Sequence, residues 1–254
     1  MDYELNDKVV IVTGGGQGLG RAYSMGFGEQ RASVAVVDIN EKNAEAVAAE
    51  ARAAGAPKAV AVVADVSDEK SVEAMVKTVE AELGAPTALI NNAALLSALD
   101  LKASRDLSVE EWDRVMAVNL RGPWLCSRAV SRPMSEQGYG KIVNISSNTV
   151  WWGRQGYPHY VSSKAAVLGL TRSLATEFGP EGIYVNVIVP GLTVTEVPRE
   201  TISDELVASV TEQTALKRGE SPADLVGPVM FLCSPASDYI TGQALVVDGG
   251  VAFN

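Results

Sequence analysis

Histidine and cysteine are scarce in this sequence. The chain of 254 residues contains one histidine, His159, and two cysteines, Cys126 and Cys233. A single histidine excludes a metal site built from several histidines, and the wide separation of the cysteines fits neither a zinc site nor a redox motif. We therefore expect no bound metal. Two isolated cysteines favour packed, reduced thiols and a cytoplasmic protein.

Basic charge and long apolar runs are also lacking. The chain has 21 Lys and Arg against 31 Asp and Glu, which gives a net charge of −10. This balance argues against a nucleic-acid surface and against a basic membrane-binding face. No apolar run approaches the roughly 18 residues of a membrane span, and the stretch from Met1 to Glu4 lacks the pattern of a signal peptide. We expect neither nucleic acid nor a membrane as a partner.

The sequence does contain a regular alternation of strand and helix patterns. Hydrophobic residues make up 47% of the chain, which suffices for a sizeable core, and no linker or low-complexity tract divides it. This alternation implies right-handed crossovers and a parallel sheet. We expect one α/β domain over residues 1–254, Rossmann-like and doubly wound, with a seven-stranded parallel sheet and helices on both faces. The expected strands are residues 8–12, 33–37, 59–63, 88–90, 140–147, 183–189 and 244–247.

A glycine-rich turn, Thr-Gly-Gly-Gly-Gln-Gly-Leu-Gly, follows the first expected strand as residues 13–20. Its glycines would let backbone N–H groups approach a diphosphate, and the helix N-terminus that follows favours negative charge. Asp38 ends the second strand, where an acid accepts hydrogen bonds from the adenosine ribose and repels a 2′-phosphate. Neither Gly15 nor Ile39 supplies a compensating positive charge. The pattern predicts NAD rather than NADP. The structural alternatives are that the glycine turn is a loop without a ligand and that Asp38 is only a helix cap or turn residue.

Tyr160 and Lys164 form a candidate catalytic pair. They are four residues apart at the start of a helix expected over residues 161–178, so they share one helix face. A phenol has a pKa of about 10, and a nearby ammonium lowers it, so that the tyrosine can exchange a proton with an alcohol or a carbonyl. The hydroxyl of Ser147, at the end of the neighbouring strand, could hold the substrate oxygen. The structural alternative is that this spacing is common in helices.

Together these features resemble the short-chain dehydrogenase/reductase family. Ser147 precedes Tyr160 by thirteen residues, as in the family pattern, which selects Ser147 over Ser146 and Tyr160 over Tyr157. The resemblance covers essentially the whole chain. The residues that carry it are Thr13-Gly14, Gly18, Gly20, Asp65, Asn91-Asn92-Ala93, Asn119, Ser147, Tyr160, Lys164 and Pro190-Gly191.

The resemblance implies a role for each matching residue. Tyr160 would be the general acid and base, Ser147 would bind the substrate oxygen, and Lys164 would bind the nicotinamide ribose and lower the pKa of Tyr160. Asn119 would hold a water of a proton relay. The resemblance also implies a homotetramer, with helices at about residues 108–131 and 160–178 forming an interface. The implied cofactor-binding residues are Gly14, Gln17, Gly18, Leu19, Gly20, Asp38, Ile39, Asp65, Val66, Asn91, Asn92, Ala93, Tyr160, Lys164, Pro190, Gly191, Thr193 and Thr195.

Three positions depart from the family pattern. Ala94 stands where glycine usually follows Asn-Asn-Ala, and Thr87 replaces a frequent aspartate. Arg31 stands where a glycine commonly ends the first helix. If that position requires a positive φ, Arg31 costs about 1 kcal/mol.

Substrate choice would lie in three segments, residues 95–99, 150–159 and a lid over about 192–220. The candidate substrate-binding residues there, beside Ser147 and Tyr160, are Leu95, Trp151, Trp152, Tyr157 and Val194. Large apolar rings suit an alicyclic or aryl-substituted substrate. One or both of Trp151 and Trp152 could equally well pack at a subunit interface, where aromatic residues are enriched. Arg154 or His159 could meet a polar or anionic group.

The sequence thus predicts an NAD-dependent enzyme that interconverts a secondary alcohol and a ketone by hydride transfer. A reductase of 3-oxoacyl thioesters is an alternative, against which the acidic charge and Asp38 argue weakly. A non-catalytic NAD-binding protein is a second alternative, but it would give Ser147, Tyr160, Lys164 and Asn119 no reason to occur together.

Overall fold

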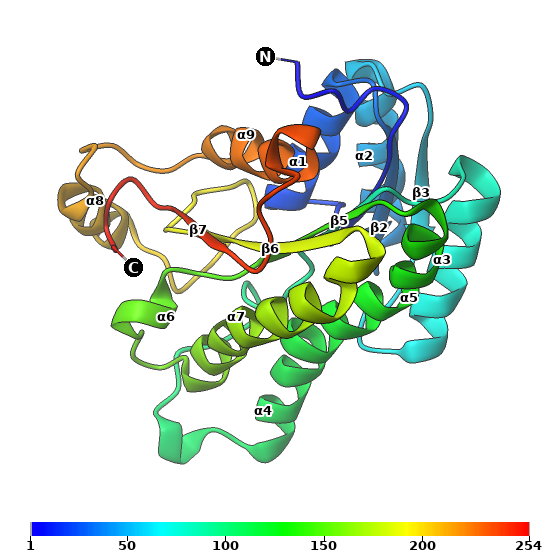
Figure 1. Ribbon diagram of the computed structural model, residues 1–254. Helices are drawn as coiled ribbons and strands as arrows, with labels where there is room; N and C mark the ends of the chain where they lie inside the picture. Colours follow the sequence, from blue (N-terminus) through cyan, green and yellow to red (C-terminus); the bar gives the residue numbers. More distant parts are fainter. Residues whose placement is uncertain (1, 254) are drawn as a thin grey trace.

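The computed structural model describes residues 2–253 and contains one seven-stranded sheet in the order β3-β2-β1-β4-β5-β6-β7 (Figure 1). Every neighbouring pair of strands is parallel. This is the α/β, doubly wound arrangement predicted from the sequence. The strands are β1 (Val9–Thr13), β2 (Ser33–Asp38), β3 (Ala59–Val63), β4 (Ala88–Asn91), β5 (Gly140–Ile145), β6 (Ile183–Pro190) and β7 (Ala244–Val247).

Helices cover both faces of the sheet (Figure 1). One face packs against α1, α2 and α9, and the other packs against α3, α5 and α7. No helix within residues 2–253 combines the length and apolarity needed to cross a membrane. The helices are α1 (Gly18–Glu29), α2 (Glu41–Ala54), α3 (Glu69–Leu83), α4 (Val109–Met116), α5 (Gly122–Gln137), α6 (Thr149–Trp152), α7 (Pro158–Phe178), α8 (Asp204–Gln213) and α9 (Pro222–Cys233).

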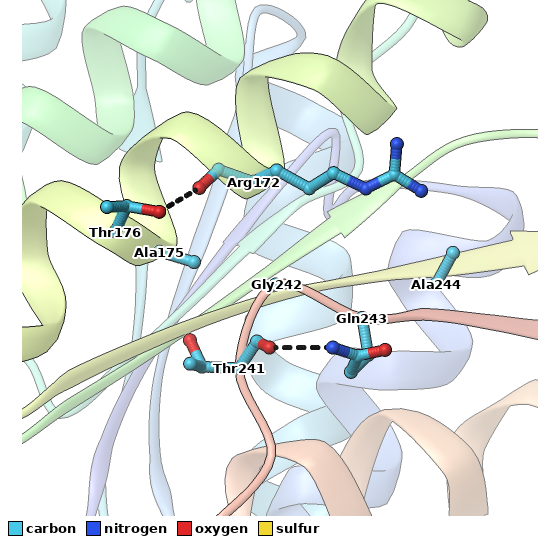
Figure 2. Close-up of a pocket in the computed structure, with 7 residues that line it drawn as sticks. All are labelled: Arg172, Ala175, Thr176, Thr241, Gly242, Gln243 and Ala244. Carbon is cyan, nitrogen blue, oxygen red and sulfur yellow. Dashed lines mark hydrogen bonds between the residues drawn. The ribbon is translucent and has the colours of Figure 1, made fainter.

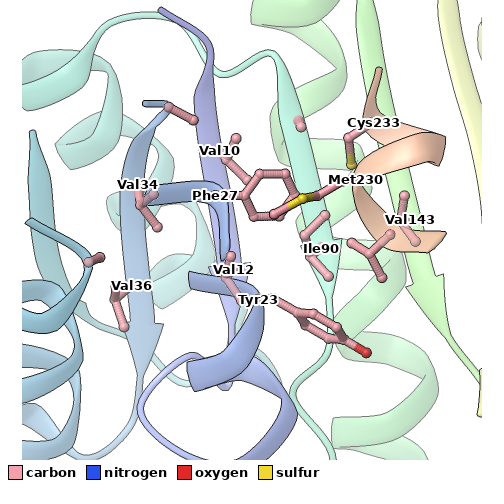
Figure 3. Packing of buried hydrophobic residues seen from close by; sticks show 14 of the residues in the cluster. Val10, Val12, Tyr23, Phe27, Val34, Val36, Ile90, Val143, Met230 and Cys233 are labelled. Atoms are coloured by element: carbon pink, nitrogen blue, oxygen red, sulfur yellow. The ribbon is translucent and has the colours of Figure 1, made fainter. Parts of the chain in front are cut away.

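The core between β1, α1 and α9 is almost entirely apolar. Figure 3 shows the ring of Phe27 lying between Val10 of β1 and Met230 of α9. Tyr23 lies one turn earlier on α1 and is fully buried in the same cluster. This packing holds the first turn of α1 against the end of β1, where the glycine-rich turn lies.

The chain adds β2 and β3 on one side of β1 and β4 to β7 on the other side, so the strand order reverses between β1 and β4. The register places Thr13 beside Val37 and Val12 beside Ile90. The carboxyl ends of β1, β2 and β4 therefore lie side by side. In open α/β sheets this is where ligands bind.

Two element bounds differ from the sequence expectation near the candidate site. The helix with Tyr160 starts at Pro158, not at Val161, because proline suits the first turn of a helix. Strand β5 ends at Ile145, two residues before Ser147. The backbone N–H groups of Ser146 and Asn148 still donate to the O of Ile188 and the O of Pro190, at 2.8 and 2.9 Å, so Ser147 lies between two backbone bonds to β6.

The segment expected to form a lid contains α8 and is tied at its base by Glu220. This carboxylate accepts hydrogen bonds from the N of Gly191, at 3.0 Å, and from the hydroxyl of Thr193. A second tie joins Oη of Tyr157 to Oγ1 of Thr201 at 2.7 Å. The two ties fix both the base and the middle of the segment.

Candidate active site

The glycine turn is held so closely that Gly14, Gly15, Gly16 and Gly20 leave no room for a Cβ. A Cβ on Gly20 would lie 2.0 Å from the O of Gly14, and a Cβ on Gly14 would lie 2.8 Å from Cα of Ala93. Asn92 fixes the turn, because its side-chain amide donates to the O of Thr13 and the O of Gly14 at 3.0 and 3.1 Å. The cleft beside this turn therefore presents bare backbone.

Asp38 lies at the carboxyl end of β2 and contacts the same turn. One carboxylate oxygen accepts from the N of Gly16 at 2.9 Å, and the other accepts from the N of Asn40 at 3.0 Å. A Cβ on Gly16 would lie 2.9 Å from Oδ2 of Asp38. The sequence analysis missed this contact, although the third consecutive glycine was a signal for it.

Most of the predicted cofactor-binding residues line one cleft along the carboxyl ends of the strands. Bare glycine backbone at one end and a carboxylate at Asp38 fit a dinucleotide with its diphosphate over α1. The predicted residues that line the cleft are Gly14, Gln17, Gly18, Leu19, Asp38, Ile39, Asp65, Val66, Asn92, Ala93, Tyr160, Lys164, Pro190, Gly191, Thr193 and Thr195.

Two predicted cofactor residues, Gly20 and Asn91, do not line the cleft. Gly20 lies behind the turn, against Gly14. Asn91 is buried, and its amide nitrogen donates to Oδ1 of Asn144 at 2.8 Å and to Oγ of Ser127 at 3.1 Å. These bonds point its side chain into the protein, so Asn91 ties β4 to β5 and α5 and does not face the ribose as expected.

Ser147, Tyr160 and Lys164 meet where this cleft joins a second cavity, and all three are buried. Oγ of Ser147 accepts from Oγ1 of Thr149 at 3.0 Å. Nζ of Lys164 donates to the O of Ile145 at 2.8 Å and lies 5.9 Å from the ring centroid of Tyr160. The three side chains predicted to do the chemistry are thus brought together.

Burial raises the pKa of Tyr160 above the ordinary value of 10. The hydrogen bond with Ser147 and the charges of Arg199 and Arg154 act in the opposite direction. Lys164, expected to lower the pKa of Tyr160, is itself buried, and burial lowers its own pKa to about 8. The sequence analysis did not foresee that two arginines would affect the phenol.

Asn119 lies on a π-helical segment, Ala117–Arg121, between α4 and α5. Its Oδ1 accepts from the N of Leu95 at 2.7 Å, and its Nδ2 donates to the O of Leu95 at 3.2 Å and to Oγ of Ser163 at 3.3 Å. π-helical turns often mark functional sites. Asn119 thus connects the backbone of Leu95, which lines the cleft, to Ser163 of α7.

The second cavity has a volume of about 880 Å³ and adjoins Ser147 and Tyr160. Trp152, with an exposed fraction of 52%, lies on its wall. Leu95 lies instead on the cofactor cleft, where Leu96 borders both spaces. Several wall residues were not foreseen. Leu101, Arg199 and Val251 lie in irregular segments without a periodic pattern, and Leu206 and Val210 lie one turn apart on α8.

Three residues predicted to contact substrate do not line this cavity. Tyr157 is fully buried, and its hydroxyl is hydrogen-bonded to the hydroxyl of Thr201 and to the O of Leu99, so Tyr157 supports the cavity wall from behind. Trp151 packs against Val167 and Val187, because α6 turns it toward α7 and β6. Val194 is half exposed and is not part of the cavity wall. His159 is buried, and burial lowers its pKa.

A separate hollow of about 430 Å³ lies at the other end of the strands (Figure 2). It joins α7 to the amino end of β7, whereas Ser147 lies at the carboxyl ends. Two of its polar side chains bond within the chain, since Thr176 donates to the O of Arg172 and Gln243 donates to the O of Thr241. None of the predicted site residues lines this hollow, so we place the functional site in the cleft.

Comparisons with known proteins agree with this geometry. A family model described as enoyl-(acyl carrier protein) reductase matches residues 14–252. The Rhizobium meliloti protein named "Probable galactose dehydrogenase GalD" is 39% identical over 249 residues, 98% of this chain and 96% of that protein. The chain belongs to the short-chain dehydrogenase/reductase family.

Other members of the family are similarly close. The (2S)-[(R)-hydroxy(phenyl)methyl]succinyl-CoA dehydrogenase subunit BbsD of Thauera aromatica is 37% identical, covering 97% of both chains. A candidate NAD(P)-dependent gluconate 5-dehydrogenase from Beutenbergia cavernae, solved with NADP at low occupancy, is 34% identical, covers 99% of both chains and has a TM-score of 0.90. Membership makes this chain an oxidoreductase with a nicotinamide cofactor.

Proposed function

We propose that this protein oxidises a secondary alcohol to a ketone with NAD. The observation that carries the proposal is that Ser147, Tyr160 and Lys164 are all buried and line the same cleft as the glycine turn. A non-catalytic binding protein would not need a buried phenol and a buried amine at this place.

The chain's own residues would hold the alcohol and move its proton. The hydroxyl of Ser147 fixes the substrate oxygen, and Tyr160 accepts the hydroxyl proton as general base. When bound, the nicotinamide ring supplies the hydride acceptor. Lys164, with its pKa lowered to about 8, can pass on a proton near neutral pH. Asn119, on its π-helical segment, is proposed to hold the water that links Lys164 to solvent.

Support for NAD comes from Asp38. Its carboxylate stands at the end of β2 on the cleft and would repel a 2′-phosphate. The neighbouring Ile39 is exposed and neutral. The Beutenbergia cavernae relative was solved with NADP, so both cofactors belong in the test.

The wall formed by Trp152, Leu101 and Leu192 supports an apolar alicyclic or aryl-substituted substrate. The name of BbsD describes a substrate alcohol with a phenyl group, which supports the same substrate class. The name of GalD describes galactose and would support a sugar. Residues 192–220 would act as a lid over this substrate. A 3-oxoacyl-thioester reductase is the second candidate, because a relative named 3-oxoacyl-[acyl-carrier-protein] reductase FabG, from Staphylococcus aureus, is 36% identical over 245 residues.

A cytoplasmic homotetramer remains part of the proposal. Its support is an apolar hollow on the expected interface helices, lined by Met116, Leu120, Trp124 and Leu170. Trp124 is half exposed there and stacks under Arg128, whose guanidinium lies 4.8 Å from the ring centroid. Sedimentation velocity measures this assembly directly.

The test is an initial-rate assay that follows reduced nicotinamide. Alicyclic, aryl, sugar-like and 3-hydroxyacyl alcohols are each offered with NAD and with NADP, and a Tyr160→Phe variant is the inactive control. The proposal predicts NAD-dependent turnover of cyclic or aryl alcohols. Preference for NADP, or turnover of 3-hydroxyacyl thioesters alone, would favour the reductase.

A further inference from the structure

Two arginines face the substrate cavity without an acidic partner. Arg199 and Arg154 both lie on its wall. Within residues 2–253 neither takes part in an ion pair; Arg199 donates to the O of Thr193, and Arg154 donates to the O of Thr201 at 3.0 Å. A guanidinium has five N–H donors. Most of those donors are therefore left for a ligand.

The other charged groups of the wall are Lys102 and Glu200. Lys102 is paired with Glu111, so its charge is already neutralised. Glu200 is exposed and forms no ion pair with either arginine among the described residues. The cavity therefore carries unbalanced positive charge, although the whole chain carries −10.

The two guanidinium groups are close to the reacting end of the cavity. Both lower the pKa of Tyr160 through their charge. Arg199 borders the cofactor cleft as well as the substrate cavity, and burial lowers its pKa. A partly buried cation without a counter-ion costs free energy, which a bound anion would recover.

We propose that the alcohol oxidised here carries a carboxylate, which Arg199 binds with Arg154 as a second donor. The inference rests on the proposed function and narrows it to hydroxy acids that bear a ring or aryl group. The carbinol C–H gives a hydride to NAD⁺, the hydroxyl proton goes to Tyr160, and the carboxylate is unchanged. Arginine suits this task because its planar fork binds both carboxylate oxygens.

The first experiment compares matched substrates. 3-Hydroxycyclohexanecarboxylate and mandelate are each assayed against their neutral carboxamides with NAD, in the wild type and in Arg199→Gln, Arg154→Gln and Arg172→Gln. We expect the wild type to prefer the acids in kcat/KM, and Arg199→Gln to lower that preference by roughly 10- to 100-fold. Arg172→Gln is the control: it removes the same charge from the hollow at the other end of the strands, away from the substrate cavity, and leaves the preference unchanged.

The ratio of acid to amide isolates carboxylate binding. Arg199→Gln also removes a charge that acts on Tyr160, but this effect is common to both members of a pair and cancels. Equal turnover of acid and amide by the wild type contradicts the inference, and so does a parallel loss of both in Arg199→Gln. A raised KM for NAD with an unchanged ratio would assign Arg199 to the cofactor instead.

A binding measurement separates this inference from the proposed function. Cyclohexanecarboxylate and its carboxamide are titrated calorimetrically into the full chain, with and without NAD, at low and high salt. We expect salt-sensitive binding of the acid alone, lost in Arg199→Gln. If no alcohol is turned over but the acid still binds in this way, the proposed oxidation is wrong and the proposed carboxylate site is supported. If acid and amide bind with equal affinity, the proposed carboxylate site is wrong.

Discussion

The backbone N–H of Gly18 donates a hydrogen bond of 2.9 Å to Oε1 of Glu196. Gly18 is the first residue of α1, and Glu196 lies in the segment after β6. A carboxylate at a helix N-terminus is favourable, because the helix dipole and free N–H groups attract negative charge. The proposed NAD diphosphate needs the same place. Glu196 must therefore move aside when the cofactor binds.

Replacing Glu196 should tighten cofactor binding. In Glu196→Gln the competing charge is gone, and we expect the Kd for NAD to fall by about two- to fivefold. Fluorescence titration of NADH and calorimetry of NAD⁺ measure it. Glu200→Gln makes the same charge change nearby without a contact to Gly18 and serves as control. Weaker binding in Glu196→Gln would instead mean that Glu196 helps to hold the cofactor.

Two buried tyrosines should respond oppositely to loss of the hydroxyl. Oη of Tyr23 has no hydrogen-bond partner among the described residues, whereas that of Tyr157 bonds to Thr201 and Leu99. Tyr23→Phe should stabilise the protein and Tyr157→Phe should destabilise it, each by about 1–2 kcal/mol. Thermal unfolding should show shifts of about 2–4 °C per kcal/mol in opposite directions. A loss of stability in Tyr23→Phe would show that its hydroxyl is bonded, for instance to a buried water.

The end of α1 carries a strained arginine. Arg31 has a φ of 62°, and the bonds from Arg31 N to Gly28 O and from Ala32 N to Phe27 O form a Schellman motif. Arg31→Gly should stabilise the fold by about 0.5–1 kcal/mol, because glycine adopts this φ freely. Urea unfolding measures the change. Arg31→Ala keeps the Cβ and should gain nothing; an equal gain there would assign the effect to the arginine side chain.

The sequence was sufficient wherever local chemistry decides the structure. Helices α2 and α3 begin where local chemistry marks a helix N-terminus, because the side chains of Asn40 and Asp68 accept from the N of Asn43 and the N of Ser71. The capping box of Ser108 and Glu111 is a local signal of the same kind at the start of α4. At Arg31 the family pattern raised a positive φ as a condition, and the structure has a φ of 62° there.

The sequence was insufficient where tertiary packing decides. Trp151 and Trp152 are adjacent, but the short helix α6 directs one into the core and the other to the cavity. Arg199 lies in an irregular segment whose direction no periodic pattern reveals. Asn91 matched the family motif, yet its amide points to Asn144, because β4 and β5 are paired at that register.

Lys164 should make stability rise with pH in the protein without added cofactor. Burial lowers its pKa to about 8 in the folded state, against about 10.4 when unfolded. Between these values the unfolded chain holds one more proton, so the free energy of unfolding increases by about 1 kcal/mol from pH 7 to pH 9. Urea unfolding of the wild type and of Lys164→Met at both pH values isolates this difference. A difference between the two proteins that is the same at pH 7 and pH 9 would contradict the lowered pKa.

The most direct test of the account is the effect of Tyr160→Phe on chemistry and binding measured together. The best alcohol of the substrate panel is assayed with NAD, and the Kd for NAD is measured on the same protein, with Tyr157→Phe as the matched control. If Tyr160 moves the proton, kcat falls by about a hundredfold or more while the Kd for NAD changes little, and Tyr157→Phe keeps most of its kcat. If Tyr160→Phe retains more than about a tenth of the wild-type kcat, Tyr160 is not the acid and base, and the proposed mechanism is wrong.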